Sequence, residues 1–164
     1  MTNRQLKTQL KRLGACCDAV TWVGARDLAT AWRECLRGDW LLWLCAKQIG
    51  EPGWPTHQAV VLAACACAEV ALVYVPAGED RPRLALEAAR KWTRGGATVA
   101  EVRATYAATT SAYAATDAAY AAAAATDAAY AAAYAATVYA YASPLSLAHS
   151  ADLVRSMLTI PSVA

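Results

Sequence analysis

The feature that most constrains this chain is an alanine-rich segment from residue 106 to residue 141, which reads YAATTSAYAATDAAYAAAAATDAAYAAAYAATVYAY. The segment contains no Gly, Pro, Lys or Arg, and its only charged residues are Asp117 and Asp127. Because Ala has the highest helix propensity of the amino acids, the segment predicts helix rather than a flexible linker.

The predicted helical region extends beyond this segment on both sides. Thr98 and Glu101 have the S/T-x-x-E spacing of a capping box, which predicts a helix start, and no Gly or Pro follows until Pro144. A single unbroken helix over 98–142 would be about 65 Å long at the rise of an α-helix. Two internal Thr-Asp pairs could instead cap new helices. One long rod and two to three folded-back helices are therefore both compatible with the sequence.

Tyrosines recur along this segment at heptad spacing. Steps of seven from residue 106 reach Tyr at five of six positions, with one slip of the repeat at Tyr130. This is the period of a coiled-coil seam. An isolated helix of this kind would expose a long Tyr and Ala face, which usually marks an interaction surface. We therefore expect a homo-oligomer formed through Tyr106, Tyr113, Tyr120, Tyr130, Tyr134 and Tyr141.

Ice binding and membrane insertion fit the sequence less well. In composition the segment resembles Ala-rich type I antifreeze helices, in which Thr recurs with an eleven-residue period. Thr105 and Thr116 fit that step, but the next two positions are Asp127 and Val138. The apolar stretch 59–75 contains a Glu and is rich in Ala and Cys. It predicts a buried core helix rather than a membrane span.

The remaining sequence predicts a compact bundle of short helices. Apolar residues recur at helical spacing between Gly and Pro breaks, and no stretch alternates like a strand bounded by hairpin turns. We expect helices from a cap at Asn3 to Gly14, over 16–23, over 26–37 with an end at Gly38, from a cap at Asp39 to Gly50, from a cap at Thr56 towards Val75, from a cap at Asp80 to Gly95 and over 145–158. The fold class is all-α, with one domain over 1–164 that comprises a helical core (1–96), the Ala/Tyr region (98–142) and a C-terminal helix.

Charge and composition exclude several classes of function. The formal net charge is +2, which is too small to predict nucleic-acid binding. The start MTNRQLKTQLKRLG lacks the apolar core of a signal peptide. Six Cys without an export signal indicate reduced thiols in a cytoplasmic protein. We expect all six to be buried as small apolar side chains: Cys16, Cys17, Cys35, Cys45, Cys65 and Cys67.

No group of residues predicts catalysis, a metal site or a cofactor. His57 and His149 have no partner at ligand spacing, and the Cys spacings fit no standard zinc motif. Gly95 and Gly96 mark a helix break rather than a phosphate-binding loop. Nothing places a Cys at a helix N-terminus beside a His, as a Cys-His hydrolase would need. We therefore expect a non-enzymatic protein without a cofactor.

The tryptophans predict a core and one surface anchor. Trp32, Trp40, Trp43 and Trp92 fall at helical positions beside apolar residues, which is typical of core anchors. Trp22 is not assigned to either group. Trp54 lies between Gly53 and Pro55 in a predicted loop and is the best candidate for an exposed anchor in an interface.

The stretch RPRLALEAARKW, residues 81–92, resembles the D-x-R-P-R-x-A-I-E-A-A-R-x-W block of bacterial immunity proteins from polymorphic-toxin systems. Glu79 stands where the block has Asp, and Leu86 stands where it has Ile. The upstream stretch CLRGDWLLW, residues 35–43, is similar to a G-D-W-x-x-W block of the same group. The resemblance covers about residues 14–142. It implies an all-α protein that neutralises a cognate toxin by direct binding, with no catalytic residues.

We expect the partner, a toxin or a defence component, to contact exposed side chains of the N-terminal part. Asp80 can cap the helix predicted over 81–92. Within that helix, Glu87 can form ion pairs with Arg83 and Lys91, which lie four residues away on either side. The candidate partner-binding residues are Trp54, Arg81, Arg83, Glu87 and Arg90. Three other functions stay open: a phage-encoded protein that binds a host defence component, a structural assembly protein, and an enzyme or small-molecule binder. A ligand pocket lined by Trp and Cys would favour the last.

Overall fold

The computed structural model describes residues 1–72, 78, 80–109 and 144–161, and this part of the chain is helical throughout, without a β-strand. The all-α fold class is confirmed. The helices are α1 (Asn3–Leu13), α2 (Cys17–Val23), α3 (Leu28–Glu34), α4 (Gly38–Lys47), α5 (His57–Ala71), α6 (Arg81–Thr93), α7 (Val99–Thr109) and α10 (Pro144–Met157).

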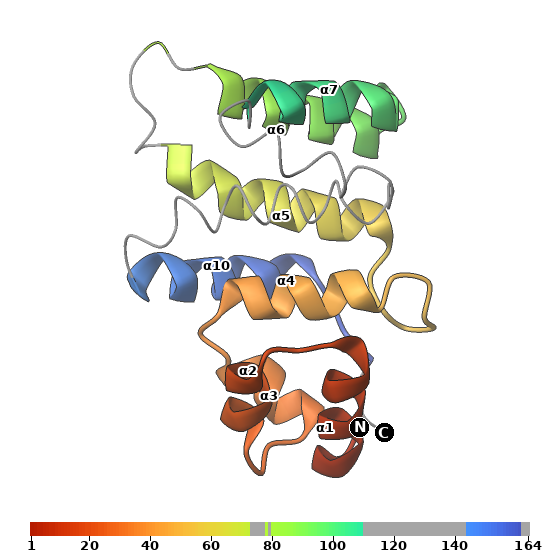
Figure 1. Ribbon diagram of the computed structural model, residues 1–164, viewed down its shortest axis with the longest axis vertical. Helices are drawn as coiled ribbons and strands as arrows, with labels where there is room; N and C mark the ends of the chain where they lie inside the picture. The colour runs from red at the N-terminus through yellow and green to blue at the C-terminus, as the bar shows by residue number, and fades with distance from the viewer. Residues whose placement is uncertain (73–77, 79, 110–143, 162–164) are drawn as a thin grey trace.

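The helices are stacked in layers that largely follow the order of the chain (Figure 1). The short helices α1, α2 and α3 form one end of the stack. Helix α4 lies next, side by side with α10, and α5 packs against both of them. Helices α6 and α7 pack against each other at the opposite end, with α6 in contact with α5. The C-terminal helix therefore returns to the middle of the stack, between helices from the first half of the chain.

Local capping explains several helix starts. The hydroxyl of Thr56 accepts a hydrogen bond from the backbone N–H of Ala59 at 3.2 Å, as predicted. The predicted capping box of α7 is also present: the Thr98 backbone N–H donates to the Glu101 carboxylate at 2.6 Å, and the Glu101 N–H donates to the Thr98 hydroxyl at 3.2 Å. Each cap satisfies backbone donors that the first helical turn leaves without a partner.

Three predicted caps are wrong: those at Asn3, at Asp80 and, at the start of α4, at Asp39. Thr2, not Asn3, caps α1 and forms a capping box with Gln5. The side-chain amide of Asn3 instead donates to the carbonyl oxygens of Gly24 and Arg26 at 2.9 and 2.7 Å, which ties α1 to the loop after α2. Asp80 occupies the position before α6, but its backbone is already helical and its side chain forms no capping hydrogen bond.

The boundary between α3 and α4 also differs from the prediction. Helix α3 ends at Glu34, and Gly38 begins α4 instead of ending the helix before it. A tertiary contact accounts for the glycine at this position: a Cβ at Gly38 would lie 2.6 Å from the Cβ of Ser150 in α10. The spacing of Leu36 with Leu28 and Trp32 predicts one shared helical face, but Leu36 lies in the intervening loop and is 63% exposed. Asp39 lies inside the first turn of α4 and does not cap it.

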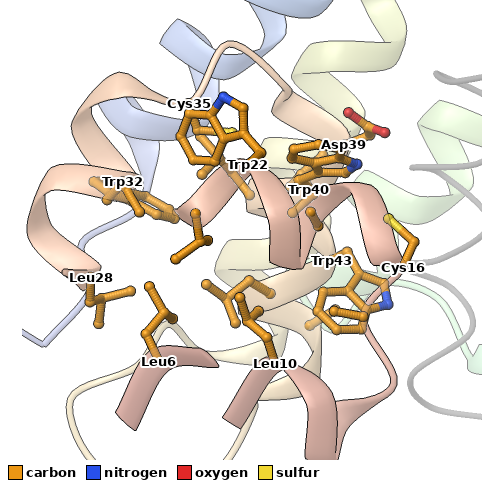
Figure 2. Close-up of a pocket in the computed structure, with 18 of the residues that line it drawn as sticks. Leu6, Leu10, Cys16, Trp22, Leu28, Trp32, Cys35, Asp39, Trp40 and Trp43 are labelled. Atoms are coloured by element: carbon orange, nitrogen blue, oxygen red, sulfur yellow. The ribbon is translucent and has the colours of Figure 1, made fainter. Parts of the chain in front are cut away.

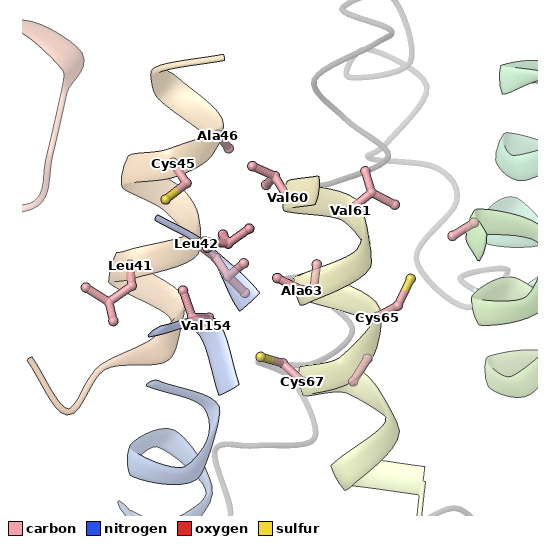
Figure 3. Packing of buried hydrophobic residues seen from close by; sticks show 14 of the residues in the cluster. Leu41, Leu42, Cys45, Ala46, Val60, Val61, Ala63, Cys65, Cys67 and Val154 are labelled. Carbon is pink, nitrogen blue, oxygen red and sulfur yellow. The ribbon is translucent and has the colours of Figure 1, made fainter. Parts of the chain in front are cut away.

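The larger of two hydrophobic clusters is built around α5. In Figure 3, Val60, Ala63 and Cys67 point from α5 toward α4 and α10, whereas Val61 and Cys65 point to the opposite side. All five side chains are buried. Helix α5 is therefore apolar on nearly every face because it has neighbours on both sides, as the prediction of a core helix requires. It ends at Ala71, before the predicted boundary at Val75.

The second cluster joins the three short helices to α4. Its buried members are Leu6, Leu10, Val23, Leu28, Ala31 and Leu44. Trp22, Trp54 and Ile160 are partly buried and contact both clusters. These three side chains connect the end of the stack to its centre.

Most of the Ala/Tyr region lies outside the described residues. Helix α7 covers Val99–Thr109 of the predicted 98–142 region, and its side chains beyond residue 104, Tyr106 included, are not described. Tyr113, Tyr120, Tyr130, Tyr134 and Tyr141 lie in the undescribed stretch. The predicted C-terminal helix over 145–158 corresponds to α10. Among the described helices, none has the combination of length and apolar character that a membrane crossing requires.

Candidate functional site

A cavity lies between the three short helices and α4. Its volume is about 440 Å³, and four tryptophans line it: Trp22 from α2, Trp32 from α3, and Trp40 and Trp43 from α4. Aliphatic side chains that include Leu6 and Leu10 of α1 complete the wall (Figure 2). Leu6 and Leu10 are one helical turn apart, so both face the same side.

The tryptophans are held by contacts with each other and with arginines. The rings of Trp22 and Trp40 meet edge to face, with centroids 6.1 Å apart and planes at 66°. The guanidinium of Arg26 lies 4.6 Å from the ring centroid of Trp22, and that of Arg37 lies 4.6 Å from the centroid of Trp40. Such cation–π contacts hold an indole ring in one orientation.

The charge at the cavity is already compensated. Asp39 is the only charged residue among the lining residues. Its two carboxylate oxygens accept hydrogen bonds from Nε and Nη2 of Arg37 at 2.8 and 2.6 Å. A bidentate pair of this kind is among the strongest side-chain hydrogen bonds. The cavity is therefore an aromatic and aliphatic space without a free counter-charge.

Two lining cysteines differ in their surroundings. Cys35 is buried, and burial raises the pKa of its thiol above the ordinary value of 9.0. Cys16 lines the cavity and is exposed, so this residue borders both the cavity and the solvent. In Figure 2 the Trp43 ring lies next to Cys16.

The structure does not bring the predicted partner-binding residues together on one surface. Arg83 and Glu87 are both exposed on α6, one helical turn apart. Arg90 forms an ion pair with Glu69 of α5, so it holds α6 against the core. Trp54 is only partly exposed and packs against both hydrophobic clusters. The Arg81 side chain lies outside the described part of the structure.

The surface of α6 contains one residue that sequence reasoning misplaced. The spacing of Leu84, Ala88 and Trp92 predicts that they share one helical face, but Leu84 is 51% exposed, and Leu86 and Ala89 are buried. Steps of three and four residues fit either set, so periodicity alone could not separate them. No ion pair joins Glu87 to Arg83 or Lys91 within the described residues. The predicted i,i+4 pairs are therefore absent from this surface.

The expectation of six buried thiols is correct for four of them. Cys35, Cys45, Cys65 and Cys67 are buried, whereas Cys16 and Cys17 are exposed at the start of α2. Helix α2 has only seven residues, and Cys16 and Cys17 stand at its first turn. In Figure 1 it lies at the end of the stack.

The two histidines lie apart from the cavity. His57 starts α5, and its ring meets Trp92 of α6 edge to face at 4.8 Å. Burial lowers the pKa of His57 below its ordinary value. His149 is exposed on α10. Within the residues that the structure describes, no three His, Cys, Asp or Glu side chains are grouped so that they could hold a metal ion.

A scan against protein-family models, a search of curated proteins and a search of solved structures each found no match for this chain.

Proposed function

We propose that this chain is a non-enzymatic helical protein that inhibits a protein partner by binding it directly, and that the partner contacts the solvent-facing side of α6. We define this α6 face as Arg83, Leu84, Glu87, Lys91 and Arg94. All five are exposed. Each residue of an α-helix is rotated by about 100° from the one before it, so these five positions lie within an arc of about 100° around the helix axis. They therefore present a single surface to a partner.

The observation that carries the proposal is the half-exposed Leu84 among charged side chains. Leu84 is 51% exposed, and the other four members of the α6 face carry three positive charges and one negative charge. An apolar contact surrounded by polar side chains is the usual anatomy of an interface. The excess of positive charge indicates an acidic partner, because complementary charge speeds encounter and excludes wrong partners.

The resemblance to immunity proteins supports the same assignment. Within the block on residues 81–92, the fixed apolar positions include Leu86 and Ala89, which are buried. The two open positions of the block are Leu84 and Lys91, and both belong to the α6 face, together with the fixed positions Arg83 and Glu87. A shared scaffold that binds different toxins would need variable residues on such a surface.

Growth rescue in cells tests the proposal. The probe is the acidic product of a neighbouring gene whose expression alone arrests growth. Co-expression of this chain is expected to restore growth and to yield a complex on purification. Arg83→Glu should abolish rescue, because it reverses a charge on the α6 face. Arg33→Glu is the matched control, since Arg33 is exposed on α3, and it should rescue fully. Equal rescue by both variants would place the contact elsewhere, and complex formation without rescue would exclude inhibition.

The heptad tyrosines lead to a second, separate proposal. From their spacing alone, we infer that the chain self-associates through the Ala/Tyr region. Light scattering at micromolar concentration should report an oligomer for the wild type. The double change Tyr113→Asp plus Tyr120→Asp should reduce it to a monomer with unchanged helicity. A wild-type monomer would refute this inference without affecting the role of the α6 face.

A further inference from the structure

We propose that the tryptophan-lined cavity binds a small, uncharged and largely aromatic molecule. This site is separate from the α6 face: its walls come from α1, α2 and α3, at the opposite end of the stack from α6, and from α4, which α5 separates from α6 (Figure 1). The inference does not depend on the proposed inhibition of a protein partner.

The size of the cavity suits a small organic ligand. Its volume of about 440 Å³ falls within the range of roughly 300 to 1,000 Å³ that is typical of ligand pockets. In Figure 2, Leu6, Leu10 and Leu28 lie across the open space from Trp22 and Trp40. A molecule in this space would contact aliphatic side chains on one side and indole rings on the other.

The charges around the cavity indicate an uncharged ligand. Asp39 is the one charged lining residue, and Arg37 binds both of its carboxylate oxygens. A cation entering the cavity would find no free counter-charge, and an anion would meet a carboxylate. Placing an unpaired charge in such apolar surroundings is costly. A neutral molecule avoids this cost.

The ring geometry indicates an aromatic ligand rather than an alkyl chain. Four indoles line one cavity, and two of them already meet edge to face at 6.1 Å. A planar ring placed among them can form further edge-to-face or offset contacts. These contacts add free energy beyond that of burying the same area. An alkyl chain of similar size gains only the burial.

We take the exposed lining residue Cys16 as the side from which a ligand enters the cavity. Cys16 lines the cavity and is exposed, whereas its neighbour Cys17 is exposed but does not line the cavity. A bound molecule should therefore shield the Cys16 thiol and leave the Cys17 thiol accessible. The two adjacent residues provide a probe and its internal control.

Binding is tested by calorimetry with three probes of similar size: 2-naphthalenemethanol, (2-naphthylmethyl)trimethylammonium and 1-decanol. The neutral naphthalene should bind one molecule per chain, and the other two should bind about tenfold more weakly or worse, a difference of about 1.4 kcal/mol. No binding of 2-naphthalenemethanol would overturn the proposal. Equal or tighter binding of the ammonium or of decanol would overturn the uncharged or the aromatic assignment, respectively.

Matched variants place the ligand in the cavity. Ala19→Leu adds volume at the cavity wall on α2, whereas Ala29→Leu makes the same change at an exposed position of α3 that does not line the cavity. Ala19→Leu should weaken binding of 2-naphthalenemethanol about tenfold and Ala29→Leu less than about twofold. Ala15→Leu, also at the wall, is the second filling variant if Ala19→Leu does not fold.

Thiol labelling gives an independent result. In Cys17→Ser the remaining exposed thiol is Cys16, and saturating 2-naphthalenemethanol should slow its labelling. In Cys16→Ser the remaining exposed thiol is Cys17, and the probe should leave its labelling rate unchanged. Equal effects of the probe on both variants, or equal affinities of Ala19→Leu and Ala29→Leu, would show that it binds outside the cavity.

Discussion

The guanidinium of Arg155 donates a 2.7 Å hydrogen bond to the backbone carbonyl of Cys35, 120 residues earlier in the chain. The same nitrogen lies 3.3 Å from the carbonyl oxygen of Trp32, and the other terminal nitrogen donates to Asp152 at 2.5 Å. These two carbonyls lie at the end of α3, where carbonyl groups have no partner within the helix. The C-terminal helix α10 therefore caps α3 and connects the short helices to the centre of the stack.

Replacement of Arg155 tests this connection. Arg155→Ala should lower the free energy of unfolding by about 2 kcal/mol, because hydrogen bonds to a charged group contribute about 1.5 to 3 kcal/mol and two carbonyls lose their donor. The measurement is urea denaturation followed by circular dichroism. Arg4→Ala, at an exposed position of α1, is the control and should change stability by less than about 0.5 kcal/mol. Equal effects would show that the contact does not stabilise the fold.

Gly38 is predicted to be essential for the contact between α4 and α10. A Cβ there would lie 2.6 Å from the Ser150 Cβ and 2.7 Å from the backbone nitrogen of Ala151. The backbone of α10, unlike a flexible side chain, cannot rotate out of the way of an added methyl group. Gly38→Ala should therefore destabilise the protein by about 1 to 3 kcal/mol or more. At Gly96 the nearest contact of an added Cβ would be an ordinary 3.5 Å. Gly96→Ala should therefore be nearly neutral, and thermal denaturation of the two variants compares them directly.

Thiol accessibility should divide the six cysteines into two groups. Under reducing pretreatment, Cys16 and Cys17 should react with a maleimide within the native protein, since both are exposed. The four buried thiols should react only in denaturant. Mass spectrometry counts the labels: two are expected in the native state and six after unfolding. Rapid labelling of more than two native thiols would contradict the burial of the core cysteines.

Alkaline pH should destabilise the fold through the buried thiols. Burial raises the pKa of Cys45 to about 12 from an ordinary 9.0. Between these two values the unfolded chain loses the thiol proton while the folded protein keeps it. Stability is therefore retained below the ordinary pKa and falls as pH rises toward the folded value. Denaturant midpoints of wild type and Cys45→Ala, measured from about pH 8 to about pH 10.5, should show a shallower fall in the variant.

A control for this comparison is Val61→Ala, which also truncates a fully buried side chain but removes no titratable group. It should lower stability at every pH and keep the wild-type slope. If Cys45→Ala and Val61→Ala have the same slope, the buried thiol does not contribute to the pH dependence. Groups that titrate in all three proteins contribute equally to each pH dependence, so they cancel when a variant is compared with wild type.

The sequence predicts those parts of the fold that depend on local interactions. Thr56 and Thr98 cap helices because the donors that they satisfy are three residues away. The role of Gly38 could not be predicted in this way, because it depends on α10, from the far end of the chain. Asn3 was misjudged for the same reason, since its amide bonds to the loop after α2 instead of its own helix.

The candidate sites were less predictable than the fold. The tryptophans were expected near apolar neighbours, and Trp32, Trp40 and Trp43 do contact the clusters. That they enclose a space depends on how side-chain volumes fill the junction of four helices, which no spacing in the sequence encodes. The exposure of Leu84 depends on which side of α6 meets α5 and α7. Helical periodicity leaves that choice open when alanines occur on several faces.

The most direct test of the account is the affinity of the chain for the growth-arresting protein that we propose as its partner, measured by titration calorimetry with two leucine variants. Leu84→Asp changes the half-exposed leucine of the α6 face, and Leu36→Asp makes the same change at another exposed leucine. The account predicts that Leu84→Asp raises Kd about thirtyfold, the effect of losing a roughly 2 kcal/mol hot spot, while Leu36→Asp leaves Kd within about twofold of wild type. Unchanged affinity of Leu84→Asp, with the fold intact, would contradict the assignment of the α6 face.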